Sequence, residues 1–264
     1  MRLATFNILH GRSPADDEVN LGRFATAVRA LDADVLALQE VDRDQPRSHG
    51  ADLTALAAES VGAPHHRFAA TLAGTPGLWS AATGDLAPDS AAYGIALVSR
   101  YPVVAWHTMA LPALPGPVPV SFRRGAPPTI VHDEPRAALS AVVDAPGGRI
   151  TVVATHLTFV PGWNAVQLRR LVASLSHHGR PVVVMGDLNL RGHLPSRLTG
   201  WRSLVEADTF PAARPRRQLD HVLAEGAVRP VTPGWARDTG VSDHRALVVD
   251  VELAHPRRPP DPEA

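Results

Sequence analysis

Eight polar side chains of types suited to metal and phosphate chemistry stand at or near the ends of expected strands. They are Asn7, Glu40, His156, Asp187, Asn189, Asp220, Asp243 and His244. Oxygen donors in a chain without cysteine favour a hard divalent cation such as Mg²⁺ or Mn²⁺ over structural zinc. Histidines beside carboxylates can stabilise or protonate a phosphoryl oxygen, and a divalent ion offsets its charge. The set is therefore typical of chemistry on a phosphate group.

The stretch PVVVMGDLNL, residues 181–190, indicates how the fold would present such groups. Residues 182–185 are apolar and bounded by proline and glycine, which favours a strand buried on both faces. Side chains alternate along a strand, so Asp187 and Asn189 point the same way if the extended geometry continues past Gly186. The alternative is that the two residues only shape a turn, as Asp and Asn commonly do. The other polar residues decide between these interpretations.

Two further candidates lie on strands near the start of the chain. Residues 2–9 alternate and carry Asn7, which needs partners because an unpaired buried amide costs about 1–3 kcal/mol. Residues 34–41 form a second strand with Glu40 on the face of Leu36. An ionised carboxylate beside a core face is costly unless it is paired or holds a metal. Both residues are therefore candidates for a polar site.

The remaining candidates come from the second half of the chain. Alternating runs at residues 136–145 and 149–157 predict a hairpin, with His156 near its end. Neighbours on an extended strand face opposite ways, so Asp243 and His244 cannot both enter one site from regular β structure. The segment that carries them must then be loop or turn.

The same rule lets only Asp220 of the pair Asp220 and His221 face the site, which leaves His221 a structural role. Helical spacing and strand patterns elsewhere predict helices at residues 21–31, 52–61 and 161–177 and strands at residues 93–104, 219–223 and 241–253.

Length and composition favour one large α/β domain over residues 1–253. The chain has 264 residues, 45% of them hydrophobic, and no linker divides it. Residues 111–135, rich in proline, predict an irregular functional loop, and the proline-rich tail at 254–264 is expected to be disordered. With no apolar leader and no run approaching about 18 apolar residues, we expect a monomeric cytoplasmic protein without a transmembrane segment.

At these residues the sequence resembles the endonuclease/exonuclease/phosphatase superfamily, the DNase I-like proteins. The resemblance covers nearly the whole chain, and its motifs are highly specific in this order. They are TFNI with Asn7, LQEVD with Glu40, YGIALVSR at 93–100, THL with His156, GDLN with Asp187 and Asn189, LDHV with Asp220, and SDH with Asp243 and His244.

The resemblance implies an α/β fold, a four-layer α/β sandwich in which two mixed β-sheets pack face to face with helices outside. It also implies hydrolysis of a phosphate ester by in-line attack of water, with Mg²⁺ or Mn²⁺ as cofactor. Glu40 would be the main metal ligand, with Asn7 and Asp243 near the ion.

The resemblance also implies roles for the other site residues. Asp187 would orient or deprotonate the water, helped by Asn189. His244, paired with Asp220, would stabilise the pentacoordinate phosphorus, and His156 would contact the phosphate or assist the leaving group.

Arg136 is a further candidate because its planar fork suits a phosphate, with a surface arginine at a strand start as the alternative. Tyr93 is interpreted as a packing residue, although an aromatic group near the phosphate is the other interpretation. The adjacent histidine pairs are interpreted as solvated surface, because they lack metal-ligand spacing: His65, His66, His177 and His178.

Three functions compete. The first is a metal-dependent phosphoesterase acting on a small or lipid-linked phosphate ester, and some relatives with similar motifs are associated with lipid-anchor remodelling. The second is a nuclease of the AP-endonuclease type, against which stand a formal net charge of zero and few base-stacking aromatics. The third is a non-catalytic binding module, which loss of a key residue would favour, and none is missing.

Overall fold

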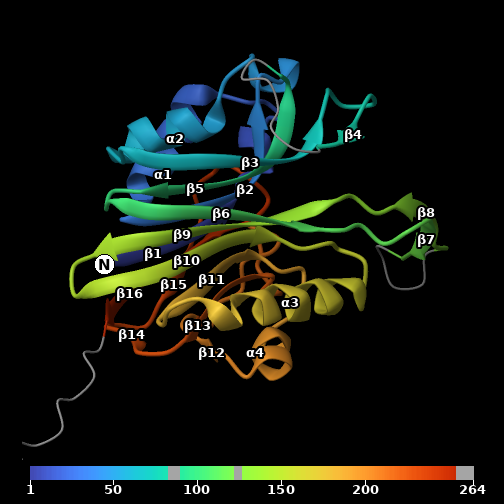
Figure 1. Ribbon diagram of the computed structural model, residues 1–264. Helices are drawn as coiled ribbons and strands as arrows, with labels where there is room; N and C mark the ends of the chain where they lie inside the picture. The colour runs from blue at the N-terminus through green and yellow to red at the C-terminus, as the bar shows by residue number, and fades with distance from the viewer. Residues whose placement is uncertain (83–89, 122–126, 254–264) are drawn as a thin grey trace, which may run out of the picture.

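The computed structural model describes residues 1–82, 90–121 and 127–253 (Figure 1). The predicted tail at 254–264 therefore lies outside the described residues. Among the helices that are described, none combines the length and the apolar character needed to cross a bilayer.

The first sheet is mixed and has eight strands. They are β1 (Arg2–Asn7), β2 (Val35–Arg43), β3 (His65–Ala73), β4 (Ser80–Ala81), β5 (Ala92–Ser99), β14 (Val228–Pro230), β15 (Trp235–Arg237) and β16 (Ala246–Leu253). Their order is β14-β16-β1-β2-β5-β3-β4, with β15 paired to β16. Strands β1 and β2 are parallel, whereas β16 is antiparallel to β1. Consequently the end of β1, the end of β2 and the start of β16 meet at one end of the sheet.

The second sheet is also mixed and has six strands. They are β6 (Val103–Leu111), β9 (Arg136–Ala145), β10 (Gly148–His156), β11 (Val182–Asp187), β12 (Arg202–Ser203) and β13 (Asp220–Glu225). Their order is β12-β13-β11-β10-β9-β6. Strands β10 and β11 are parallel, and the predicted hairpin at 136–157 is confirmed as β9 and β10.

The described part of the chain also contains four α-helices and three short 3₁₀ helices. They are α1 (Leu21–Leu31), α2 (Leu53–Val61), α3 (Trp163–Ser174), α4 (Leu194–Thr199), η1 (Leu9–Gly11), η2 (Pro46–Ser48) and η3 (Leu175–His177). The α1 helix begins where the Asn20 side chain accepts a hydrogen bond from the amide of Arg23. Asp52 caps α2 in the same way, and Gly62 ends it in a left-handed conformation.

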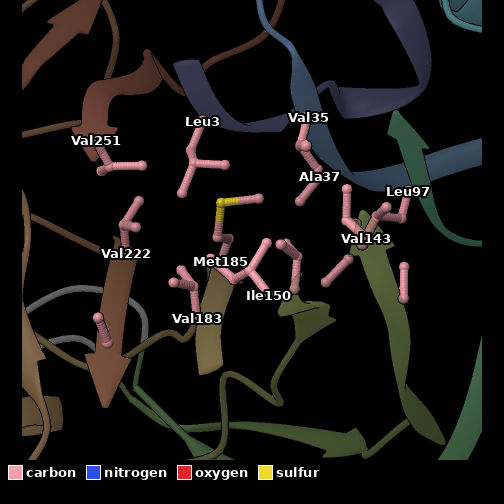
Figure 2. Close-up of a cluster of buried hydrophobic side chains, with 14 of the residues drawn as sticks. Leu3, Val35, Ala37, Leu97, Val143, Ile150, Val183, Met185, Val222 and Val251 are labelled. Carbon is pink, nitrogen blue, oxygen red and sulfur yellow. The ribbon is translucent and has the colours of Figure 1, made fainter. Parts of the chain in front are cut away.

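Three apolar clusters bind these elements into four layers. The central cluster lies between the two sheets, and Figure 2 shows side chains such as Leu3 and Val35 from one sheet facing Val183 and Met185 from the other. A second cluster packs α1 and α2 on the first sheet, and a third packs α3 and α4 on the second. The predicted α/β sandwich, with two mixed sheets face to face and helices outside, is confirmed.

Two segments contain more strand than the sequence predicted. The strand β3 was not predicted, because the run at 63–70 has little apolar alternation. Within the proline-rich segment 111–135, β7 (Pro117–Val120) and β8 (Thr129–His132) form a small antiparallel ribbon. The prolines Pro117 and Pro119 are two residues apart and so share one side of the ribbon, where no ladder hydrogen bond is required of them.

Candidate active site

The candidate residues of both sheets converge at one end of the sandwich. Asn7 is the last residue of β1, and Glu40 lies three residues before the end of the parallel strand β2. In the second sheet, His156 and Asp187 are paired at the ends of β10 and β11, and Asp187 is paired with Asp220 at the start of antiparallel β13. Because adjacent parallel strands have their carboxyl ends at the same end of the sheet, residues distant in sequence become neighbours there.

A β-bulge turns Glu40 toward the space between the sheets. The register of β2 against β5 shifts between Gln39 and Val41, and Glu40 has a φ of 57°. Regular alternation would have placed Glu40 on the face of Leu36, as the sequence predicted. Val41 instead packs with Leu36 in the apolar cluster beneath α1 and α2. The predicted facing of Glu40 is thus wrong, because the extra residue of the bulge reverses the alternation.

Asn7 links the carboxylates of the two sheets. Its Nδ2 donates to Glu40 Oε1 at 2.9 Å and to Asp187 Oδ2 at 3.1 Å. Both carboxylate oxygens bond to one nitrogen, so they are separated by less than the sum of these two distances. The partners that a buried asparagine requires are therefore acidic side chains from opposite sheets.

Asp187 Oδ2 is the point on which the site converges. Besides Asn7, the Nε2 atoms of His156 and His244 lie 3.6 Å and 3.8 Å from it. Burial raises the pKa of Asp187 to about 7, an effect that His244 partly opposes. The other oxygen, Oδ1, accepts a hydrogen bond from the amide of Asn189 at 2.9 Å.

His244 is held by Asp220. The distance from His244 Nδ1 to Asp220 Oδ2 is 2.8 Å, and both residues are buried. Burial lowers the pKa of His244, but the carboxylates of Asp220 and Asp187 outweigh that effect and raise it to about 10. The imidazole is therefore positively charged at neutral pH, and the expected contact between Asp220 and His244 is present.

His156 is paired with an arginine and has the opposite charge state. Arg136 Nη1 lies 3.2 Å from His156 Nδ1. Burial and the neighbouring Arg136 hold the pKa of His156 well below its ordinary value. Because a guanidinium can only donate, Nδ1 must accept and the proton of the neutral ring lies on Nε2, toward Asp187.

Asp243 and His244 lie in the loop before β16, as the sequence predicted for two adjacent residues that both face one site. Ser242 has a φ of 81°, and its Oγ accepts from the amide of His244 at 3.1 Å. The predicted strand at 241–253 begins only at Ala246. Asp243 is half-buried, and its charge acts on the pKa of both Glu40 and His244.

Asn189 does not continue the strand of Asp187. The extended geometry ends at Asp187, and Asn189 is left-handed with a φ of 51°. Its Nδ2 donates to the carbonyl of Leu157, while its own carbonyl accepts from Asn164 Nδ2. The side chain nevertheless lines the same cavity of about 470 Å³ as His244.

The geometry of the carboxylates fits a divalent cation. Burial raises the pKa of Glu40, and no histidine or arginine of the described chain comes within ion-pair distance of it. Ligand atoms of Asp187, Asp220 and His244 lie within 4.8 Å of one another, which is a second arrangement of metal-binding type. In this second arrangement Asp220 Oδ2 already pairs with His244 Nδ1, whereas Glu40 pairs only with the amide of Asn7 among the described residues, which favours an ion on the side of Glu40.

Several supporting residues were not found from the sequence. Two polar residues of α3, Asn164 and Gln167, are buried although the sequence pattern singled out neither. Gln167 accepts from the amide of Thr158, so it holds the loop after β10 in place. Polar residues at the positions of the buried helical face could have signalled this role.

A small cavity of about 140 Å³ lies beside Glu40 and includes another residue that was missed. Tyr93, interpreted from the sequence as packing, lines this cavity together with His10 and Arg47. No local motif pointed to His10, whose pKa burial lowers to about 4.

The other histidines considered earlier have different surroundings. His221 is buried, and its Nε2 lies 2.8 Å from the carbonyl oxygen of Leu190. The paired histidines are exposed or half-buried, and none is part of the cluster around Asp187: His65, His66, His177 and His178.

A model of the Endonuclease/Exonuclease/phosphatase family matches residues 4–244. The chain is similar to an endonuclease/exonuclease/phosphatase structure from Beutenbergia cavernae, with 27% identity and a TM-score of 0.67 over 96% of this chain and 71% of that one. No curated protein matches the sequence.

Two further structures share the fold at lower identity. The mannosyl-6-phosphatase Bt3783 of Bacteroides thetaiotaomicron is 13% identical, with a TM-score of 0.60 over 96% of this chain and 99% of that one. D. rerio TDP2 in complex with a single-strand DNA product is 15% identical, with a TM-score of 0.59 over 96% and 98% of the two chains.

Proposed function

The chain belongs to the endonuclease/exonuclease/phosphatase family of metal-dependent phosphoester hydrolases, and we propose that it hydrolyses a phosphodiester or phosphomonoester of a small molecule or lipid headgroup by in-line attack of water. The observation that carries this proposal is the convergence of Asn7, His156 and His244 on Asp187 Oδ2. The site thus combines a buried carboxylate, a neutral imidazole and a charged imidazole. We also propose that the enzyme is a cytoplasmic monomer.

Glu40, Asn7 and Asp243 are proposed to hold Mg²⁺ or Mn²⁺. The position of Glu40 supports this, because burial raises its pKa and no histidine or arginine of the described chain lies within ion-pair distance of this half-buried carboxylate, which favours a cation. When bound, the ion would offset negative charge on the phosphoryl oxygens.

Asp187 is proposed to orient and deprotonate the attacking water. A base works best when its pKa is near the working pH, and burial places that of Asp187 at about 7. Asn189 assists by holding Asp187, since its amide donates to Oδ1 and leaves Oδ2 directed at the centre of the site.

His244 is proposed to stabilise the pentacoordinate phosphorus as an imidazolium. Asp220 accepts from Nδ1 and so fixes the ring, which leaves Nε2–H toward Asp187 and the phosphate position. His156 and Arg136 are proposed to bind the phosphate from the other side, because Arg136 brings a positive charge and His156 brings a neutral donor. Each charge that develops in the transition state thus has a partner.

A nuclease is the second candidate, and one feature favours it. Arg214, Arg216 and Arg217 surround a surface hollow of about 460 Å³ that Phe210 also lines. The Phe210 ring lies 4.9 Å from that of His244, so this basic surface adjoins the site and could contact further phosphates. The formal net charge of zero opposes tight sequence-independent binding.

Hydrolysis of a defined panel tests the proposal and separates the two candidates. We expect release of 4-nitrophenol from bis(4-nitrophenyl) phosphate or 4-nitrophenyl phosphate with Mg²⁺ or Mn²⁺, and none with EDTA. The KM should depend weakly on salt, whereas a DNA substrate that releases counterions should depend on it steeply. Efficient cleavage of abasic DNA with a steep salt dependence would favour the nuclease. Lack of metal-dependent hydrolysis of any diester, monoester, phospholipid or DNA would refute both.

A further inference from the structure

A cavity of about 520 Å³ lies between the two sheets on the side where β3 and β6 run, separate from the residues around Asp187. Every residue from 68 to 71 in β3, and every residue from 110 to 112 at the end of β6, lines this cavity. Successive side chains of a strand face opposite ways, so consecutive residues can line one cavity only if the edge of the strand borders it.

The sheet topology explains why these edges are open. Among the described residues, β6 is the last strand of the second sheet, and β3 is covered at Leu72 and Ala73 by the two-residue strand β4 and at Thr71 by Ala82, whose amide donates to the Thr71 carbonyl. Figure 1 shows β3 and β6 on the same side of the sandwich, one in each sheet. Uncovered edges carry unpaired backbone donors and acceptors, which can bind a polar ligand.

Two arginines line this cavity, and the buried Nε–H group of each has no hydrogen-bond partner among the described residues. Arg136 is only 5% exposed, and its Nη groups face His156 at 3.2 Å and Glu134 at 3.4 Å. Arg43 lies over the Phe68 ring at 5.0 Å, and its Nη2 is 3.4 Å from the carbonyl of Ser90. The Asp44 carboxylate is 3.9 Å from Arg43 Nε, too far for a hydrogen bond.

The described lining contains no acidic residue. Two guanidinium groups in a cavity whose described lining has no other charged side chain favour an anion, because a guanidinium binds phosphate and carboxylate oxygens through charge-assisted hydrogen bonds. Arg136 also contacts His156 of the proposed catalytic site, so this one side chain lies between the site and the cavity. An anion in the cavity would therefore be adjacent to a phosphate in the site.

We propose that this cavity is a subsite for a second anionic group of the substrate, bound by the guanidinium groups of Arg43 and Arg136. The proposal rests on the proposed function, since it takes the reacting phosphate to lie on the His156 side of Arg136. The substrate class is then a phosphate ester with a second phosphate or carboxylate on a small polar body such as a sugar or polyol. Short side chains in the wall leave room for such a body: Ala69, Ala70, Ala82, Ala110 and Ala137.

Binding without catalysis tests the subsite. In EDTA, calorimetry would compare fructose 6-phosphate with fructose 1,6-bisphosphate and inositol 1-phosphate with inositol 1,4-bisphosphate. We expect the bisphosphate of at least one pair to bind about tenfold more tightly, as one additional charge-assisted contact would give. Arg43→Gln should remove this difference and leave monophosphate binding within about twofold, while Arg43→Lys should retain part of it.

Arg67→Gln is the matched control, since Arg67 is an exposed arginine on β3 that lies over the Trp106 ring and does not line the cavity. This variant should keep the full difference. Equal affinity for both members of each pair in the wild type, or an unchanged preference in Arg43→Gln, would overturn the subsite. Hydrolysis of chromogenic esters distinguishes the two failures, because it tests the catalytic site with substrates that carry no second anionic group.

Discussion

Replacing Asp220 with asparagine should lower the pKa of His244 by about three units. The His244 Nδ1 and Asp220 Oδ2 atoms are 2.8 Å apart, and charge centres roughly 4 Å apart at an effective dielectric constant of about 20 interact by about 4 kcal/mol. At 1.36 kcal/mol per unit, this is about three pKa units. The pKa of about 10 in the wild type would fall to about 7, because Asp187 remains 3.8 Å from Nε2.

The sign of the effect follows from the charged form of the imidazole. A raised pKa keeps His244 protonated at higher pH, so losing Asp220 deprotonates it earlier as the pH rises. At pH 8.5 the wild-type ring would be more than about nine-tenths protonated and the variant ring about one-thirtieth. The alkaline limb of the pH–rate profile should therefore move to lower pH in Asp220→Asn.

Two assays check this prediction. Imidazole ¹⁵N NMR of the metal-free protein, with the His244 signal identified by its loss in His244→Gln, measures the pKa directly. The pH dependence of kcat measures its consequence. Asp238→Asn is the control, because Asp238 is an exposed carboxylate 3.6 Å from Arg245 and should leave both unchanged. A His244 pKa that stays near 10 in Asp220→Asn would refute the pairing as the cause of the shift.

Two further predictions concern the metal and the fold. Glu40→Gln keeps the shape of the side chain but removes its charge, so activity should be lost or should require much more metal in a titration. The control Glu59→Gln, at an exposed position on α2, should behave like the wild type. Unchanged metal dependence in Glu40→Gln would contradict the ligand assignment. Gly186→Ala should destabilise the protein by about 3 kcal/mol or more in denaturant unfolding, because the new Cβ would lie 1.8 Å from the carbonyl oxygen of Thr155. The control Gly179→Ala should change stability little, because a Cβ at Gly179 would lie in open space.

Sequence patterns were sufficient for elements whose burial follows a simple period. The α1 helix has apolar residues at helical spacing between an asparagine cap and a left-handed terminal residue, and it was predicted at its observed bounds. The strand β11 and the hairpin of β9 and β10 were similarly predicted from apolar runs and turn residues. The position of polar residues at strand ends, together with the family resemblance, also identified most residues of the candidate site.

The orientation and charge state of those residues depended on contacts between distant parts of the chain. Periodicity assigns Glu40 to the wrong face because a bulge is a local irregularity of the pairing with β5. Asn189 leaves the strand in a left-handed conformation, in which its side chain donates to the carbonyl of Leu157 and its own carbonyl accepts from Asn164.

The opposite charge states of the two histidines have the same kind of origin. His156 and His244 are both buried imidazoles near Asp187, but one faces Arg136 and the other faces Asp220. The sequence determines which residue types are available, whereas burial and the neighbouring charged side chain determine the pKa values of the two histidines. Only the tertiary structure brings those neighbours within a few ångströms.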